Sequence, residues 1–224
     1  MDWQAIRLSL ELAGLTTLLL LALGLPIAHW LAFSRFRLKF LVEAVVALPI
    51  VLPPTVLGFY LLLAAGPRSP LGRLWESVWG RPLPFSFEGL LVASVLYSLP
   101  FAVQPFAAAF ASVDKSLLEA SQCLGASRFK TFRRVILPLS WPGVLAGMVL
   151  SFAHTLGEFG VVLMVGGNLP GVTRTASIAI YDEVQALNYA AAGQTALFLL
   201  VTSFLLLAVT YGLRSRQKRP WTLS

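Results

Sequence analysis

Residues 115–138 read KSLLEASQCLGASRFKTFRRVILP, a polar and basic stretch that separates two long apolar ones. Ser116, followed three positions later by Glu119, fits a capping box, in which each side chain bonds to a free N–H of a helix start. We therefore expect a helix to begin near Leu117. Its apolar residues recur at helical spacing and should form a packed face, while the polar residues meet water. These apolar residues are Val113, Leu117, Ala120 and Leu124.

Gly125 interrupts this pattern and should allow the chain to turn. A second short helix from about Ser127 would place Phe129, Phe132 and Ile136 on one side and the basic residues elsewhere. We expect Pro138 to close the segment, because proline has no backbone N–H to donate. The pattern is typical of a loop that docks against another protein. An ordinary amphipathic loop is the alternative interpretation.

The rest of the chain has the composition of an integral membrane protein. Its 224 residues are 57% hydrophobic and only 12% charged, with a mean hydropathy of +0.78. A membrane span needs about 20 apolar residues, and the stretches that qualify are 9–33, 41–65, 88–110, 142–166 and 191–213. We therefore predict an all-α, polytopic helical bundle of five spans that forms a single domain over 1–224. The segment 111–140 would be its largest cytoplasmic part, and no separate soluble domain is left to hold a nucleotide site.

The distribution of basic residues predicts the orientation of these spans. Twelve of the 17 lysines and arginines lie in 34–40, 111–140 and the tail after 213, and the other five lie in the remaining connections. The positive-inside rule then places the N terminus outside and the C terminus in the cytoplasm. This topology explains the net charge of +7 without a nucleic-acid partner. The single Cys123 falls on the cytoplasmic side, which fits a reducing compartment.

The second span carries Pro53, Pro54 and Gly58 in its middle. Adjacent prolines remove backbone donors, so this span should be kinked or locally unwound. Broken backbone at membrane depth is tolerated only against protein or a water-filled path. These three residues are therefore candidates for a translocation path, and a simple packing kink is the alternative.

The fourth span combines a stripe of small residues with two ionisable ones. The stripe recurs every four residues and should let another helix approach closely; its members are Gly143, Gly147, Ser151 and Thr155. His154 and Glu158 are four positions apart and would share a helix face. Because ionisable groups inside a membrane are costly, they could form a relay or gate. Alternatively, they bond to each other or to a backbone carbonyl, and in either case we expect Glu158 to have a protein partner.

The run Glu119-Ala120-Ser121 with Gly125 and Ile136-Leu137-Pro138 resembles the "EAA" signature of permease subunits of ATP-binding-cassette importers. That family usually has alanine at the position of Ser121. The resemblance implies a coupling helix that sits in a cleft of a cytoplasmic ATPase. The residues it assigns to coupling are Glu119, Ala120, Ser121, Gly125, Leu137 and Pro138.

Further runs look like the molybdate branch of these permeases, with sulfate permeases as the nearest relatives: Val51 to Gly58, Leu156 to Gly160, Asn168 to Gly171 and Thr173 to Thr175. The resemblance implies a homodimer in the cytoplasmic (inner) membrane of a bacterium, in contact with its lipid. Two ATPase subunits and a periplasmic or extracellular oxyanion-binding protein would be its partners. The chain has no phosphate-binding loop motif, so ATP would be used by the separate ATPase, and we expect no cofactor or metal on this chain. His154 departs from the arginine expected before the Leu-Gly-Glu run.

Other hypotheses about the function remain open at this point. The cargo could be sulfate or tungstate. A proton-coupled secondary carrier would use His154 and Glu158 as its relay, although we find no internal repeat of the kind such carriers often contain. A membrane enzyme would need a set of catalytic residues, and neither a His-Glu-x-x-His nor a Gly-x-Ser-x-Gly motif occurs. The chain is therefore expected to be a transport subunit and not an enzyme.

Overall fold

The computed structural model describes residues 1–217, and all regular structure in that range is helical. The α-helices are α1 (Trp3–Phe33), α2 (Lys39–Val51), α3 (Pro54–Ala65), α4 (Pro70–Trp79), α5 (Phe87–Ala111), α6 (Lys115–Cys123), α7 (Arg128–Thr131), α8 (Leu137–Leu156), α9 (Gly160–Gly166), α10 (Ala176–Gln185) and α11 (Tyr189–Gln217). A π-helical turn, η1 (Phe132–Ile136), joins α7 to α8.

Four stretches within residues 1–217 are long and apolar enough to cross a membrane as continuous helices: α1, α5, the run from α7 to α8, and α11. A fifth span is formed if α2 and α3 are taken together, although they meet at a bend of 112°. The predicted all-α membrane bundle is therefore confirmed. The bend falls at Leu52–Pro53, where the sequence predicted a broken helix.

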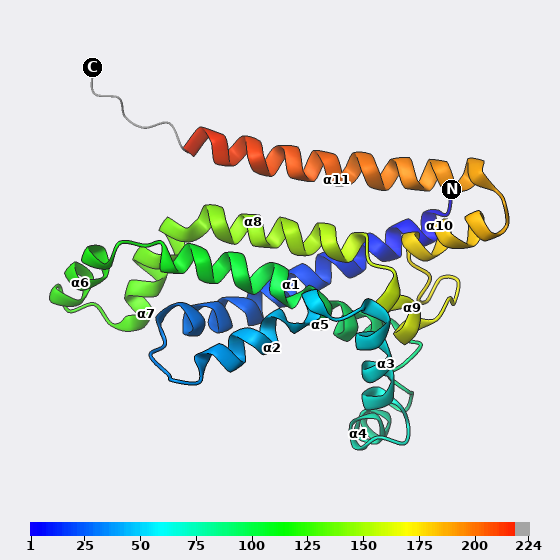
Figure 1. The fold of residues 1–224 in the computed structure, drawn as a ribbon, viewed down its shortest axis with the longest axis horizontal. Helices are drawn as coiled ribbons and strands as arrows, with labels where there is room; N and C mark the ends of the chain where they lie inside the picture. Colours follow the sequence, from blue (N-terminus) through cyan, green and yellow to red (C-terminus); the bar gives the residue numbers. More distant parts are fainter. Residues whose placement is uncertain (218–224) are drawn as a thin grey trace.

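The centre of the bundle is the packing of α1, α5 and α8, which lie side by side in Figure 1. Phe106 and Phe110 of α5 are fully buried there, together with Leu20 of α1 and Val144 of α8. The small-residue stripe of α8 faces α5, as predicted. A Cβ atom at Gly147 would lie 2.6 Å from the Phe106 ring, so only glycine permits this approach of the two helices.

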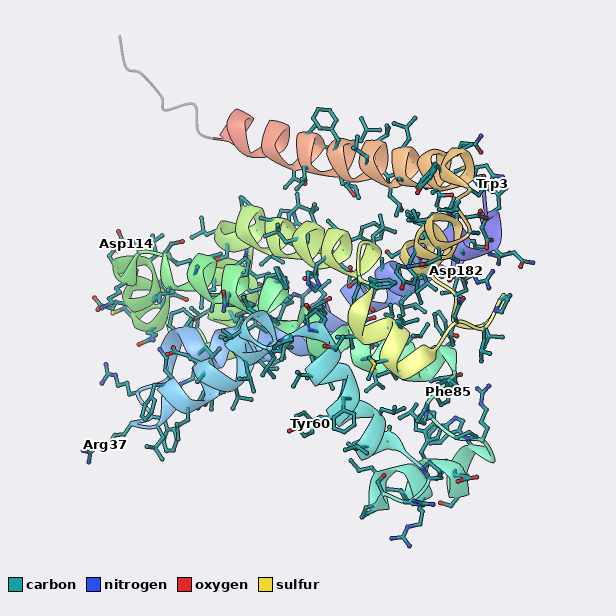
Figure 2. The ribbon with its side chains drawn as sticks, turned by 45° about the vertical axis from the view of Figure 1, so that its right-hand side comes forward. Trp3, Arg37, Tyr60, Phe85, Asp114 and Asp182 are labelled. Carbon is teal, nitrogen blue, oxygen red and sulfur yellow. The ribbon has the colours of Figure 1, made fainter. Side chains whose placement is uncertain are left out.

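The helices place the connecting segments at two opposite ends of the bundle. Figure 1 shows α6 and α7 at the same end as the turn between α1 and α2, and the N terminus and α10 at the other. Figure 2 shows the same division, with Arg37 and Asp114 far from Trp3 and Asp182. The segments 34–40 and 111–140, which we grouped because of their basic residues, therefore lie at the same end of the bundle. The basic tail residues Lys218 and Arg219 lie outside the described part of the chain.

The fourth span differs from its prediction. We expected one helix over 142–166, but α8 ends at Leu156 and α9 begins only at Gly160. The break contains Gly157 and Glu158, but the apolar residues on both sides of it led us to expect one continuous span. The short helices α4 and α10 lie outside the predicted spans, and α10 was not predicted.

Candidate functional site

The docking segment, defined here as residues 114–138, begins at a different residue from the one predicted. Asp114 caps α6, and its carboxylate accepts a hydrogen bond of 2.9 Å from the Ser116 backbone N–H. This hydrogen bond lowers the pKa of Asp114 below its ordinary value. The capping box between Ser116 and Glu119 is therefore wrong. Glu119 lies in the second turn of α6 with an exposed side chain and does not hold the helix start.

The turn between α6 and α7 is closely defined. Gly125 has a φ of +73°, a left-handed conformation that glycine adopts without steric cost. No atom within 4 Å would meet a Cβ at Gly125, so backbone conformation is the reason for glycine here. The Ser121 and Thr131 hydroxyls bond at 2.8 Å and tie α6 to α7. Ser127 caps α7, so the second short helix begins where the sequence predicted it.

The apolar face predicted for the first helix packs at Val113, which is buried in the core, but it is exposed along the docking segment itself. Leu124 is 87% exposed and Phe129 is 72% exposed, and no residue of α6 is buried. Leu117 is exposed as well, while its neighbour Leu118 packs against the core. Exposed apolar side chains grouped at the tip of a hairpin are typical of a protein–protein contact.

Pro138 does not close the segment. It is the second residue of α8, and the helix continues through it from α7 by way of η1. In η1 the Leu137 N–H donates to the Phe132 carbonyl, five residues back. A π-helical turn accommodates a proline because the pairing is already shifted by one residue. The docking segment therefore continues directly into a membrane span.

A second group of predicted site residues lies where two helix breaks meet. α3 packs against α9 through two glycines. A Cβ on Gly58 would lie 2.7 Å from Cβ of Met164, and one on Gly160 would lie 2.7 Å from Cβ of Pro54. The structure thus brings Pro54 and Gly58 into contact with the segment after Glu158. It assigns Gly58 a role in close packing between the two broken spans.

The two ionisable residues of this region do not bond to each other. His154 Nδ1 lies 2.9 Å from Ser98 Oγ, and its ring stacks on Phe101 at a centroid distance of 3.9 Å. Glu158 is only 5% exposed, yet neither carboxylate oxygen makes a hydrogen bond within residues 1–217. The Ser94 hydroxyl, close enough to influence Glu158, also lacks a hydrogen-bond partner in that range. The predicted partner on a neighbouring helix is thus Ser94 of α5, but its contact with Glu158 falls short of full hydrogen-bond geometry in the described structure.

The third matched motif forms a loop at the opposite end of the molecule from the docking segment. Asn168 donates to Asp182 at 2.6 Å and accepts from Arg174 at 2.7 Å. Thr173 donates to the Gly166 carbonyl at 2.7 Å. These bonds hold the loop against α9 and α10. Within residues 1–217 no group of three or more His, Cys, Asp or Glu side chains could hold a metal ion.

Comparison with known proteins gives consistent matches over nearly the whole chain. The family model described as "Binding-protein-dependent transport system inner membrane component" matches residues 22–219. The chain is 54% identical over 213 residues to the molybdenum transport system permease protein ModB of Azotobacter vinelandii, which covers 95% of this chain and 94% of that protein. It is 39% identical over 184 residues to the Escherichia coli K12 protein of the same name, and the match covers 82% of this chain and 80% of that protein.

Solved structures share the fold at low sequence identity. An inward-facing structure of the MetNI methionine ABC transporter matches with a TM-score of 0.78 at 16% identity, covering 98% of this chain and 97% of that one. A bacterial alginate ABC transporter in complex with an alginate pentasaccharide-bound periplasmic protein matches with a TM-score of 0.72 at 19% identity. The match covers 96% of this chain and 79% of that one.

Proposed function

Because the chain belongs to the family of binding-protein-dependent transport system inner membrane components, we propose that it is the permease subunit of an ATP-driven molybdate importer. The observation that carries this proposal is the 54% identity, over nearly the full length of both chains, to a molybdenum transport permease. The protein is a multi-pass component of the inner membrane. Its role is transport, and ATP is hydrolysed on a separate subunit.

The docking segment is the surface for that ATPase. It presents exposed Leu117 and Leu124 at one end of the bundle, where a cleft in a cytoplasmic protein can cover them. The hydroxyl bond between Ser121 and Thr131 and the fixed turn at Gly125 keep the hairpin in one shape. A rigid hairpin transmits a displacement, whereas a flexible one absorbs it. The resemblance assigns Glu119, Ala120, Leu137 and Pro138 to the same coupling role.

The translocation path lies at the two helix breaks, which bring Pro53, Pro54 and Gly58 beside the segment that carries His154 and Glu158. Five spans are few to enclose a path for a hydrated dianion, so two copies of the chain form it together. The end that holds the loop of Asn168 and Arg174 faces outward and receives the oxyanion-binding protein. The basic residues at the docking end support this orientation, with the N terminus outside.

Uptake of radiolabelled molybdate into proteoliposomes tests the proposed function. The vesicles contain this permease with its ATPase subunits, ATP is supplied on the ATPase side, and the purified binding protein is added on the other. We expect uptake that requires all three components and is lost with an ATPase variant that binds ATP without hydrolysing it.

Two controls separate the rival functions. A protonophore should leave uptake unchanged, because a proton-coupled carrier would instead lose its driving force. Excess unlabelled sulfate should compete weakly and excess molybdate strongly. Uptake driven by a proton gradient without ATP would contradict an ATP-driven importer. Preferential uptake of sulfate would contradict molybdate as the cargo.

A further inference from the structure

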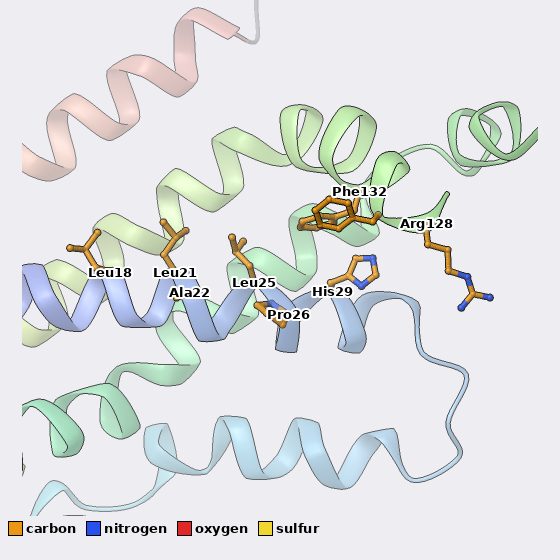
Figure 3. A pocket seen from close by; sticks show the side chains of 9 residues that line it. Leu18, Leu21, Ala22, Leu25, Pro26, His29, Arg128 and Phe132 are labelled. Atoms are coloured by element: carbon orange, nitrogen blue, oxygen red, sulfur yellow. The ribbon is translucent and has the colours of Figure 1, made fainter. Parts of the chain in front are cut away.

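An apolar groove runs along α1 and ends at the docking segment. It has a volume of about 680 Å³. Side chains from α1 form one side, and two aromatic rings from α7 and η1 form the end. Figure 3 shows the α1 residues in a row along the helix. The apolar lining comprises Leu18, Leu21, Ala22, Leu25, Pro26, Phe129 and Phe132.

The polar groups of the groove are gathered at one end. His29 and Arg128 line it there, beyond the apolar row, as Figure 3 shows. Arg128 is exposed, and Lys130, Arg133 and Arg134 follow it within the same segment. The groove therefore has an apolar length and a cationic end, and it opens outward, because Leu18 on its side is 60% exposed.

We propose that this groove binds one anionic phospholipid, with an acyl chain along α1 and the phosphate group at Arg128. The surroundings of the groove support this occupant. α1 crosses the membrane, so the outward side of the groove faces hydrocarbon. Basic pockets between membrane helices at the cytoplasmic side are suited to anionic headgroups, which that leaflet supplies. The apolar row favours an acyl chain, and Arg128 favours an anionic headgroup.

A second copy of this chain is a less suitable occupant. A two-fold contact centred on the groove would bring the same surface of both copies together. The basic residues from Arg128 to Arg134 would then face their own counterparts, and like charges repel. A lipid phosphate has the complementary sign.

Native mass spectrometry of the detergent-purified, full-length chain can measure this binding. The probes are phosphatidylglycerol and phosphatidylcholine with identical acyl chains. Arg128→Gln should weaken phosphatidylglycerol binding about fivefold, which corresponds to about 1 kcal/mol for one basic residue at an anionic surface. It should leave phosphatidylcholine unchanged. Lys130→Gln is the matched control, since Lys130 lies on the same short helix but does not line the groove, and it should change neither lipid.

A second variant tests the apolar part. Ala22 is exposed, so Ala22→Trp fills the groove without disturbing the core and should remove the preference for phosphatidylglycerol. Leu18→Trp serves the same purpose if Ala22→Trp does not fold. An equal loss of phosphatidylglycerol binding in Arg128→Gln and Lys130→Gln would show a general attraction of the lipid to the basic surface and overturn the proposal. A fall in the dimer fraction of the filled variant with unchanged lipid binding would assign the groove to the second copy and overturn it as well.

Discussion

At the scale of single residues, Gly125 is the position where the docking segment depends most on backbone conformation. Its φ of +73° costs an L-residue about 1–2 kcal/mol, and more for a β-branched side chain. We expect Gly125→Val to distort the hairpin while the five spans still insert. ATP hydrolysis should then be uncoupled from uptake, as measured by the number of ATP molecules consumed per molybdate in proteoliposomes.

Gly193→Val is the matched control for that experiment. Gly193 also has open space around a new Cβ, but it lies in α11, away from the docking segment, and lacks a positive φ. It should leave coupling intact. Normal uptake together with normal retention of the ATPase in Gly125→Val would remove the coupling role of this turn.

The capping residue provides a second test at the same scale. Asp114→Ala should loosen the start of α6 because the Ser116 N–H loses its acceptor. Asp114→Asn should largely preserve it. Since the pKa of folded Asp114 is lowered, its contribution is complete at neutral pH and is lost only as the pH falls below about 4. Hydrogen exchange of the α6 amides measures the effect, and faster exchange in Glu119→Ala than in Asp114→Ala would contradict the assignment.

Glu158 is expected to lower the stability of the protein in the described conformation. A buried polar group without a hydrogen bond costs about 1–3 kcal/mol, and neither oxygen of Glu158 has one within residues 1–217. Glu158→Leu should therefore raise the thermal unfolding temperature in detergent, and Glu158→Gln should raise it less. If Glu158 belongs to the path, both variants should also reduce uptake. A large drop in stability with Leu would instead show that Glu158 has a stabilising partner.

Two residue-level predictions failed for identifiable physical reasons. The capping-box pattern at Ser116 and Glu119 is also compatible with a cap two residues earlier, and Asp114 is the stronger acceptor there. The spacing of His154 and Glu158 implies a shared face only while the helix continues. Because α8 ends at Leu156, Glu158 leaves that face and His154 bonds to Ser98 instead.

At the scale of elements, the sequence predicted every span but not every break. Hydropathy located the five stretches, and Pro53 marked the bend between α2 and α3 because proline cannot continue the hydrogen-bond ladder. The break at Gly157–Phe159 has no proline and no polar run. It depends on the packing of α9 against α3, which is tertiary and invisible to a local pattern. Gly160 was therefore matched as a motif residue without its role being recognised.

That packing is testable at two glycines. A methyl group on Gly160 would meet Pro54 at 2.7 Å, and one on Gly58 would meet Met164 at the same distance. Because Cβ atoms cannot move like the ends of long side chains, Gly160→Ala and Gly58→Ala should each destabilise the protein by about 1–3 kcal/mol. Thermal unfolding in detergent measures this. Gly14→Ala in α1, with no atom within 4 Å, should be close to neutral, and equal effects at all three sites would contradict the packing.

At the scale of the whole molecule, α8 connects the two candidate sites. It begins at Leu137, where the docking segment ends, and finishes at Leu156, beside the break that holds Glu158. Its 20 residues correspond to about 30 Å of helix, which is the thickness of the hydrocarbon core. If an ATPase binds the docking segment as proposed, a continuous helix would carry a displacement of α7 to the proposed path. Short loops at either end would have interrupted such a connection.

This arrangement works only if the docking end faces the cytoplasm, and the single cysteine tests that orientation directly. Cys123 is exposed at the end of α6. In intact cells without the ATPase, a membrane-impermeant maleimide should fail to label it, whereas permeabilised cells should label readily. A Cys123→Ser, Glu76→Cys variant moves the only thiol to the exposed surface of α4 near the opposite end and should label in intact cells. Because both positions are exposed, a difference in labelling reflects the membrane barrier and not burial. Labelling of native Cys123 from outside would reverse the topology, and the docking segment would then face away from any source of ATP.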